Sequence, residues 1–165
     1  MTVGKPNNQN RPRRSLRGEK HNMSNSYLTL KAKHKNELHA IPIRFAFCMR
    51  QFEDAMKELG LTPNDTDKIY RLPGGGFIRK TDAKAFSDML KRFSDEKEEA
   101  ITADADGTGY IFEMFDYELR NHEYGYTHDP EPTLDALGLT IAEVEANPVM
   151  SAAFKRAKAA QFKGD

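Results

Sequence analysis

The sequence predicts an α+β fold, with a small antiparallel sheet packed by helices and a helical C-terminal half. Apolar residues alternate with others from Ile41 to Phe47, which is typical of a β-strand. Two short apolar runs flank the turn at residues 73–76, and this pattern predicts a β-hairpin over residues 68–80. From residue 81 onward, apolar residues recur mainly at helical spacing. We therefore expect residues 25–165 to form a single α+β domain.

Helices are predicted on both sides of this sheet in the chain. Residues 27–39 have a few leucines that indicate a short helix, and residues 51–59 form an amphipathic helix that Gly60 ends. Thr81 is placed to cap the helix that follows the hairpin. Helical character then continues to Ala103.

The most informative stretch is residues 103–129, where a glycine-rich turn precedes an aromatic-rich helix. The stripe of this helix consists of Ile111, Phe115, Leu119 and His122. We expect the helix to end at Gly125, because glycine is the usual residue after a helix C-terminus.

The remaining chain is predicted to be helical, with clear start and stop signals. A short helix before Gly138 is followed by Thr140 and Glu143, which have the spacing of a capping box. Asn147 and Pro148 then begin the last helix, because proline is favoured in a first helical turn.

Composition favours a soluble protein of a reducing compartment. Cys48 is the only cysteine, so an intramolecular disulfide and a cysteine zinc cluster are excluded. No apolar run approaches the length needed to span a membrane, and the N-terminus lacks the apolar core of a signal peptide. We expect a cytoplasmic protein that does not bind membranes.

The first 24 residues form a basic arm, for which we expect disorder because they contain little apolar surface to bury. One interpretation is a solubilising extension, and the other is contact with nucleic-acid phosphates. The basic cluster consists of Arg11, Arg13, Arg14, Arg17 and Lys20.

Residues 81–150 have a net charge of the opposite sign. Residues 81–150 contain seventeen acidic and five basic side chains, although the whole chain has a net charge of zero. Such an acidic surface either is simply solvated or attracts a basic partner. The candidate interaction residues are Asp95, Glu96, Glu98, Glu99, Glu113 and Asp116.

The turn that begins at Asp104 resembles the first eight positions of an EF-hand calcium loop. Asp104, Asp106 and Thr108 are candidate metal ligands with the spacing of positions 1, 3 and 5. Position 12, which requires a bidentate glutamate, is Phe115. The alternative is a polar connection between two helices, so calcium is at most a weak cofactor and otherwise no cofactor is expected.

His122 continues an apolar stripe, and with Glu123 it is a candidate for a functional polar core. One interpretation is a partly buried histidine that is bonded to a carbonyl or a carboxylate. The other is a metal ligand or general base, with Glu118, Glu123, His128 or Asp129 nearby. No spacing typical of a zinc-hydrolase helix is present.

Several short runs of residues occur together in a known group of proteins. They are Phe45-Ala46-Phe47, Gln51-Phe52, residues 56–61, Lys68-Ile69-Tyr70, residues 75–80 with Asp82, residues 117–119, residues 121–124 and residues 134–140. On these runs, the stretch from Phe45 to about Phe154 resembles a family of uncharacterised small bacterial proteins of phage and mobile-element genomes. The resemblance implies an accessory role and brings no catalytic residues.

Three functional classes follow from these features. The first is an interaction protein whose acidic surface binds a basic protein, such as a host nucleic-acid-binding protein or a defence nuclease. The second is a metal-binding module or metal-assisted enzyme around Asp104, Asp106 and His122. The third is a nucleic-acid binder that uses the basic arm. Because no nucleophile and base have a recognisable spacing, the first class is favoured over an enzyme.

Overall fold

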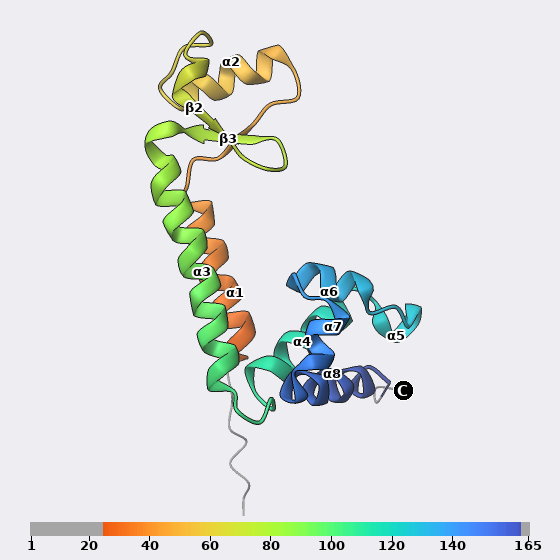
Figure 1. Cartoon of the computed structure of the whole chain (residues 1–165). Helices are drawn as coiled ribbons and strands as arrows, with labels where there is room; N and C mark the ends of the chain where they lie inside the picture. The colour runs from red at the N-terminus through yellow and green to blue at the C-terminus, as the bar shows by residue number, and fades with distance from the viewer. Residues whose placement is uncertain (1–24, 163–165) are drawn as a thin grey trace, which may run out of the picture.

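The computed structural model describes residues 25–162, which form three parts (Figure 1). Two long helices, α1 (Ser26–His39) and α3 (Ala83–Ala103), form a stalk. Residues 40–82 form a small head at one end of the stalk, and the helices from α4 onward form a body at the other end. The chain runs from the body to the head in α1 and back to the body in α3. An α+β fold with a helical C-terminal half is thus confirmed.

The head contains the predicted sheet. Strands β1 (Arg44–Phe45), β2 (Ile69–Arg71) and β3 (Gly76–Arg79) are antiparallel in the order β1-β3-β2, with β3 in the centre. Helix α2 (Met49–Glu58) packs on this sheet, and short 3-10 turns lie at Thr66–Lys68 and Lys80–Asp82. A separate hydrophobic core of the head consists of Ala55, Met56, Leu59, Ile69 and Phe77.

Two glycine features explain the hairpin. Gly74 and Gly75 have φ angles of 86° and 90°, which a residue with a side chain rarely adopts, and they form the turn between β2 and β3. Gly76 lies opposite Phe45 across the sheet, and a Cβ atom there would lie 3.0 Å from the ring of Phe45. Glycine at this position lets the β1 strand approach β3.

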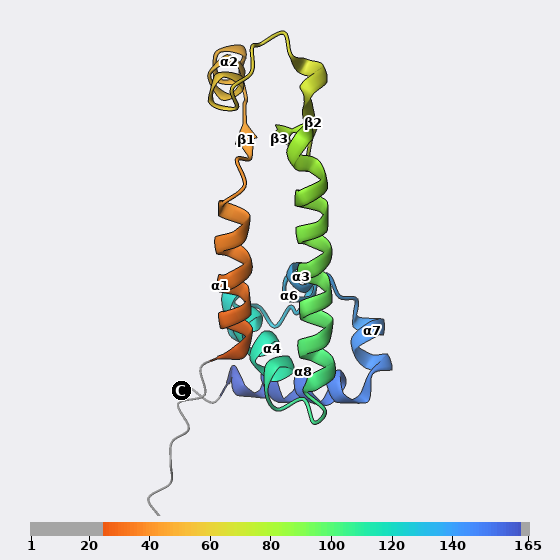
Figure 2. The ribbon, with the colours of Figure 1, turned by 90° about the vertical axis from the view of Figure 1, so that its left-hand side faces the viewer.

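The stalk helices run side by side in opposite directions (Figure 2), and polar side chains link them. Glu96 of α3 accepts bonds from Lys33 and His34 of α1, each at 2.8 Å. The imidazole of His34 stacks on the ring of Phe93 with centroids 3.9 Å apart, and Arg92 forms an ion pair with Glu37. The stalk therefore depends on ion pairs more than on an apolar seam.

The body is built around α4 (Tyr110–Asn121). It packs against α8 (Pro148–Ala160), α6 (Glu131–Leu137) and α1, while α7 (Ile141–Ala146) packs on α8. The rings of Phe115 and Phe154 lie 4.9 Å apart in its core. The core consists of Tyr27, Tyr110, Ile111, Met114, Phe115, Leu119, Leu134, Leu137, Val144, Met150, Ala153, Phe154 and Ala157.

Two predicted helix boundaries are wrong. The helix after the hairpin begins at Ala83 behind a 3-10 turn, so Thr81 does not cap it. Helix α4 ends at Asn121, because Glu123 adopts a left-handed conformation with φ of 56° that no helix continues. The predicted stop, Gly125, lies inside the short helix α5 (Tyr124–Thr127). In the described part of the chain, no helix is long and apolar enough to cross a membrane.

Candidate functional site

The head contains an open groove of about 370 Å³ between the start of α2 and the β-hairpin. Its apolar floor includes Phe52, Ile69 and Phe77, and the rings of Phe52 and Phe77 lie 5.6 Å apart. The connection at residues 46–49 forms one wall, and the hairpin turn at residues 72–76 forms the other. Short stretches of backbone therefore frame an apolar depression.

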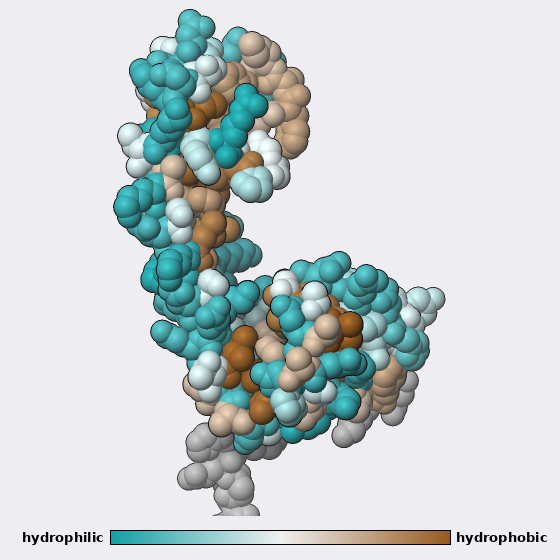
Figure 3. All heavy atoms as spheres, in the orientation of Figure 1, coloured by the Kyte–Doolittle hydropathy of each residue, from teal (hydrophilic) through white to brown (hydrophobic). Residues whose placement is uncertain are grey.

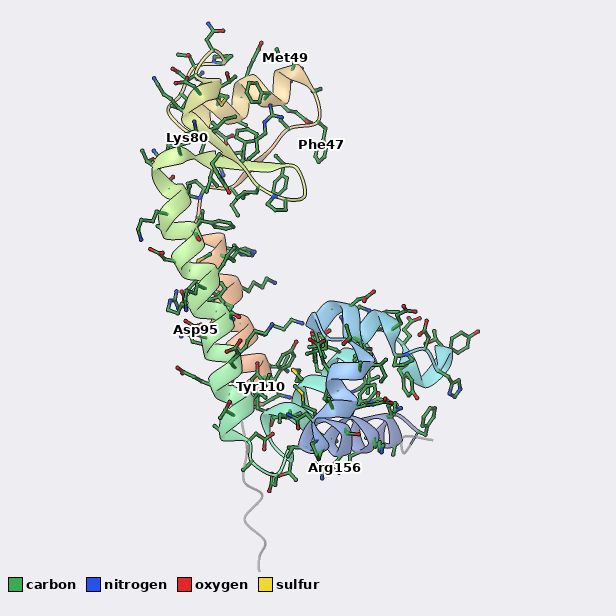
Figure 4. All side chains as sticks on the ribbon, viewed as in Figure 1. Phe47, Met49, Lys80, Asp95, Tyr110 and Arg156 are labelled. Carbon is green, nitrogen blue, oxygen red and sulfur yellow. The ribbon has the colours of Figure 1, made fainter. Side chains whose placement is uncertain are left out.

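Exposed large apolar side chains line this groove, at Phe47 and Met49, or lie beside its wall residue Gly76, at Phe45. Phe47 is 90% exposed, Met49 is 70% exposed and Phe45 is 55% exposed. Figure 4 shows Phe47 and Met49 on the side of the head that overhangs the body, and Figure 3 shows a tan apolar strip on that side. We call Phe45, Phe47, Met49 and the groove the head patch. An exposed apolar patch of this kind marks an interaction site more often than a chance surface.

The sequence pattern predicted only a strand for Phe45 and Phe47, and it assigned no role to Met49. The alternating pattern predicted a strand from Ile41 to Phe47, but β1 ends at Phe45 and leaves Phe47 outside the sheet. The available signal was the run of large apolar residues up to Met49, which is longer than a two-residue strand can bury.

The groove also has a positively charged edge. Among residues 25–162, Arg71 is the only charged residue that lines the groove, and no acidic residue of this range lines it. Helix α2 begins here with Cys48 as the N-cap residue, and the Cys48 side chain makes no capping hydrogen bond. The N–H of Phe47 donates instead to Gln51 Oε1 at 2.8 Å. The first turn of α2 therefore keeps the partial positive charge of a helix N-terminus.

The carboxylates of the Asp104 loop are bonded to the loop itself. Asp104 accepts hydrogen bonds from the N–H groups of Gly109 at 3.2 Å and Ile111 at 2.8 Å. These bonds hold the loop against the first turn of α4. Asp106 Oδ1 accepts from the N–H and hydroxyl of Thr108, and these bonds lower the pKa of Asp106. Phe115, at the twelfth loop position, is fully buried. Within residues 25–162, no group of three or more His, Cys, Asp or Glu residues could hold a metal ion.

A buried carboxylate that sequence reasoning placed only near His122 connects the stalk to the body. Glu118 is 2% exposed and accepts a hydrogen bond from the Tyr27 hydroxyl at 2.5 Å. It also forms an ion pair with Lys31, and Asn121 Nδ2 donates to it at 3.3 Å. Burial by itself raises the pKa of Glu118, but the hydrogen bonds from Lys31 and Tyr27 outweigh burial and lower it. Burial also raises the pKa of Tyr27.

His122 lies at the edge of this cluster. It follows the last residue of α4, is partly exposed, and its Nε2 lies 3.7 Å from Glu118 Oε2. Glu123 turns the chain away with its left-handed backbone. Both oxygens of Glu118 already have partners, so the cluster holds α1 against α4.

The candidate acidic residues divide into two groups. Glu96 pairs across the stalk, Glu113 accepts from the N–H groups of Ser26 and Tyr27, and Asp116 pairs with Arg120. Three others, Asp95, Glu98 and Glu99, line a shallow hollow at the body end of α3. Asp95 forms an ion pair with Lys91 at 2.7 Å. Four of the six residues therefore already have a partner within the protein.

Head, stalk and body all fall within one known family. The chain belongs to the family of unknown function DUF7659. The match covers residues 26–160, so it begins at the first residue of α1 and ends at the last residue of α8. No curated protein and no solved structure matches the chain.

The family match and the described structure both leave out the basic arm. The described residues do not include its cluster of Arg11, Arg13, Arg14, Arg17 and Lys20. The structure therefore does not test whether this cluster contacts nucleic acid. The family match therefore covers the head, the stalk and the body.

Proposed function

We propose that this protein is a binding module that acts by protein–protein contact, and that the head patch is its main binding surface. The observation that carries this proposal is the exposure of Phe47, at 90%, beside Met49 and an apolar groove. Aromatic residues and methionine are enriched in the cores of protein interfaces. Burying these two side chains against a partner removes apolar area from water, and each Å² of apolar area buried contributes about 25 cal/mol of favourable free energy.

The position of the head supports the same function. The stalk holds the head away from the body, and the two parts border an open hollow on one side of the molecule (Figure 3). The head core is separate from the body core, so a partner can contact the head without disturbing α4. The polar cluster around Glu118 fits a structural role in this arrangement, because it fixes the base of the stalk.

Substitution of the head patch tests this function. We expect the double variant Phe47→Ser, Met49→Ser to lose binding partners that the native protein captures from its own cells, as measured by quantitative mass spectrometry. The matched control is Tyr126→Ser, because Tyr126 is 88% exposed but lies on α5 of the body. Loss of partners in the double variant alone supports the proposal. Equal capture by all three proteins would refute it.

A second candidate function rests on Asp95, Glu98 and Glu99, which line the hollow at the body end of α3. We propose that this surface attracts a basic partner, such as a host nucleic-acid-binding protein or a defence nuclease, in a phage or mobile-element accessory role. Charge steering raises association rates and is screened by salt. Glu98→Lys with Glu99→Lys should slow association with the captured partner at low salt. An unchanged rate would eliminate this candidate.

A further inference from the structure

We infer that the groove of the head binds a short extended segment of a partner protein, in which a large apolar side chain lies next to a carboxylate. This inference rests on the proposed function, because it names the chemistry of the partner at the same surface. Three properties of the groove lead to it: its size, its apolar floor and the charge of its edge.

Size restricts the occupant to a few side chains. Ligand pockets usually enclose about 300–1,000 Å³, and the groove encloses about 370 Å³. Its walls are made by residues 46–49 and by the hairpin turn. An extended peptide can lie between these walls, whereas a whole domain can touch only their rims.

The floor selects an apolar side chain. Phe52 and Phe77 form a tilted aromatic pair at its base, next to Ile69, and all three belong to or pack on the head core. Their positions are therefore fixed before a partner arrives, which reduces the entropy lost on binding. Phe47 and Met49 can close over an inserted side chain, since both are exposed on the adjacent wall.

The edge selects a negative charge. Arg71 lines the groove and makes no ion pair within residues 25–162, whereas Arg44 and Arg79 of the same sheet are paired with Glu58 and Asp82. Helix α2 has no acidic residue in its first turn, where its free N–H groups lie beside the groove. A guanidinium binds a carboxylate through two parallel hydrogen bonds.

A nucleic acid fits this groove poorly. Binding to phosphates requires several lysines and arginines at once, but in the described part of the chain Arg71 is the only charged residue of the lining. A carboxylate next to an apolar anchor matches both the single guanidinium and the aromatic floor. The carboxylate can come from an Asp or Glu side chain or from a chain terminus.

The test uses the full chain and a displayed library of random short peptides. We expect enrichment of sequences with Phe, Leu, Ile or Met beside Asp or Glu, or beside a free C-terminus. The best peptide is then labelled and titrated by fluorescence polarisation, together with its Asn or Gln counterpart and its C-terminally amidated form. The carboxylate whose removal weakens binding identifies which of the two sources is used.

Variants of the protein separate this inference from the proposed function. Arg71→Gln should weaken binding of the acidic peptide by roughly 10-fold and remove its preference over the neutral counterpart. The control Arg79→Gln, outside the groove lining, should bind like the native protein. Phe47→Ser should weaken both peptides.

The outcomes are distinct. Equal binding of the acidic and neutral peptides, or no effect of Arg71→Gln, would overturn the inference that the groove binds a carboxylate. The head patch would then remain an apolar binding surface. An empty library selection, or binding of a single-stranded oligonucleotide that Arg71→Gln abolishes, would overturn the inference as a whole. Only unchanged partner capture by the Phe47→Ser, Met49→Ser variant would overturn the proposed function itself.

Discussion

Tyr27 donates a hydrogen bond of 2.5 Å to Glu118, and this bond joins the first turn of the stalk to the central helix of the body. The two residues are 91 positions apart in the chain. Lys31, one turn further along α1, forms an ion pair with the same carboxylate, and its ammonium group lies 4.7 Å from the centre of the Tyr117 ring. The base of the stalk is thus fixed by one buried charge with several partners.

Removal of this carboxylate should destabilise the protein. Glu118→Ala leaves the Tyr27 hydroxyl and Lys31 without their partner, and we expect the free energy of unfolding to fall by about 3 kcal/mol. Urea denaturation followed by circular dichroism measures this change. The matched control is Glu145→Ala, an exposed residue of α7, which should change stability by less than about 0.5 kcal/mol. Similar small effects in both variants would show that the cluster contributes little.

Acid should weaken the stalk through Glu96. Hydrogen bonds from Lys33 and His34 hold the pKa of Glu96 at about 2, below its usual 4.5. Because folding lowers this pKa, the stabilisation is complete above pH 4.5 and is lost as the pH falls toward 2. The lowered pKa of Glu118 acts in the same direction. Thermal melts over this range should show a smaller acid-dependent loss for Glu96→Gln than for the native protein, and parallel curves would contradict the assignment.

The head and the body should differ in stability, because each has its own hydrophobic core. Met56 is fully buried in the head, and Met56→Ala should cost about 2–4 kcal/mol there. We expect native-state hydrogen exchange to speed up in α2 and the sheet while amides of α4 and α8 stay protected. The reciprocal variant, Leu119→Ala, lies in the body core. Uniform loss of protection in both parts would instead support a single cooperative domain over residues 25–165.

Calcium binding at the Asp104 loop should be weak. Asp104 already accepts two backbone hydrogen bonds, and Phe115 occupies the position of the bidentate ligand. We expect calorimetry to give no dissociation constant below about 10 μM, the range of sensor sites. A tighter constant that is lost in Asp106→Asn would establish Asp104, Asp106 and Thr108 as ligands.

The basic arm should be dispensable for folding. Asn25 caps α1 through its side chain, and Ser26 bonds to Glu113, so a truncation that starts at Asn25 keeps both contacts. Such a protein should keep its Tm within about 3 °C of the full chain. A larger decrease would mean that residues 1–24 pack on the body. Loss of nucleic-acid binding on truncation, with an unchanged Tm, would support the nucleic-acid interpretation of the arm.

Local signals in the sequence determined much of the secondary structure. Thr140 and Glu143 form the predicted capping box, with both reciprocal hydrogen bonds, and Asn147 caps the helix that Pro148 begins. Gly74 and Gly75 form the predicted hairpin turn. These features depend on residues within a few positions of one another, so a single sequence is enough to predict them.

Tertiary structure alone decided which of these side chains are available to a partner. Glu96 and Glu113 looked like surface charges, but contacts with α1, between 62 and 87 positions away, give them structural roles. Phe47 was predicted to lie in a strand, but the sheet ends before it and leaves its side chain exposed. The spacing of apolar residues predicts which face of a helix or strand is apolar, but it does not predict what packs on that face. That depends on long-range packing, which here divided the protein into two cores on one stalk.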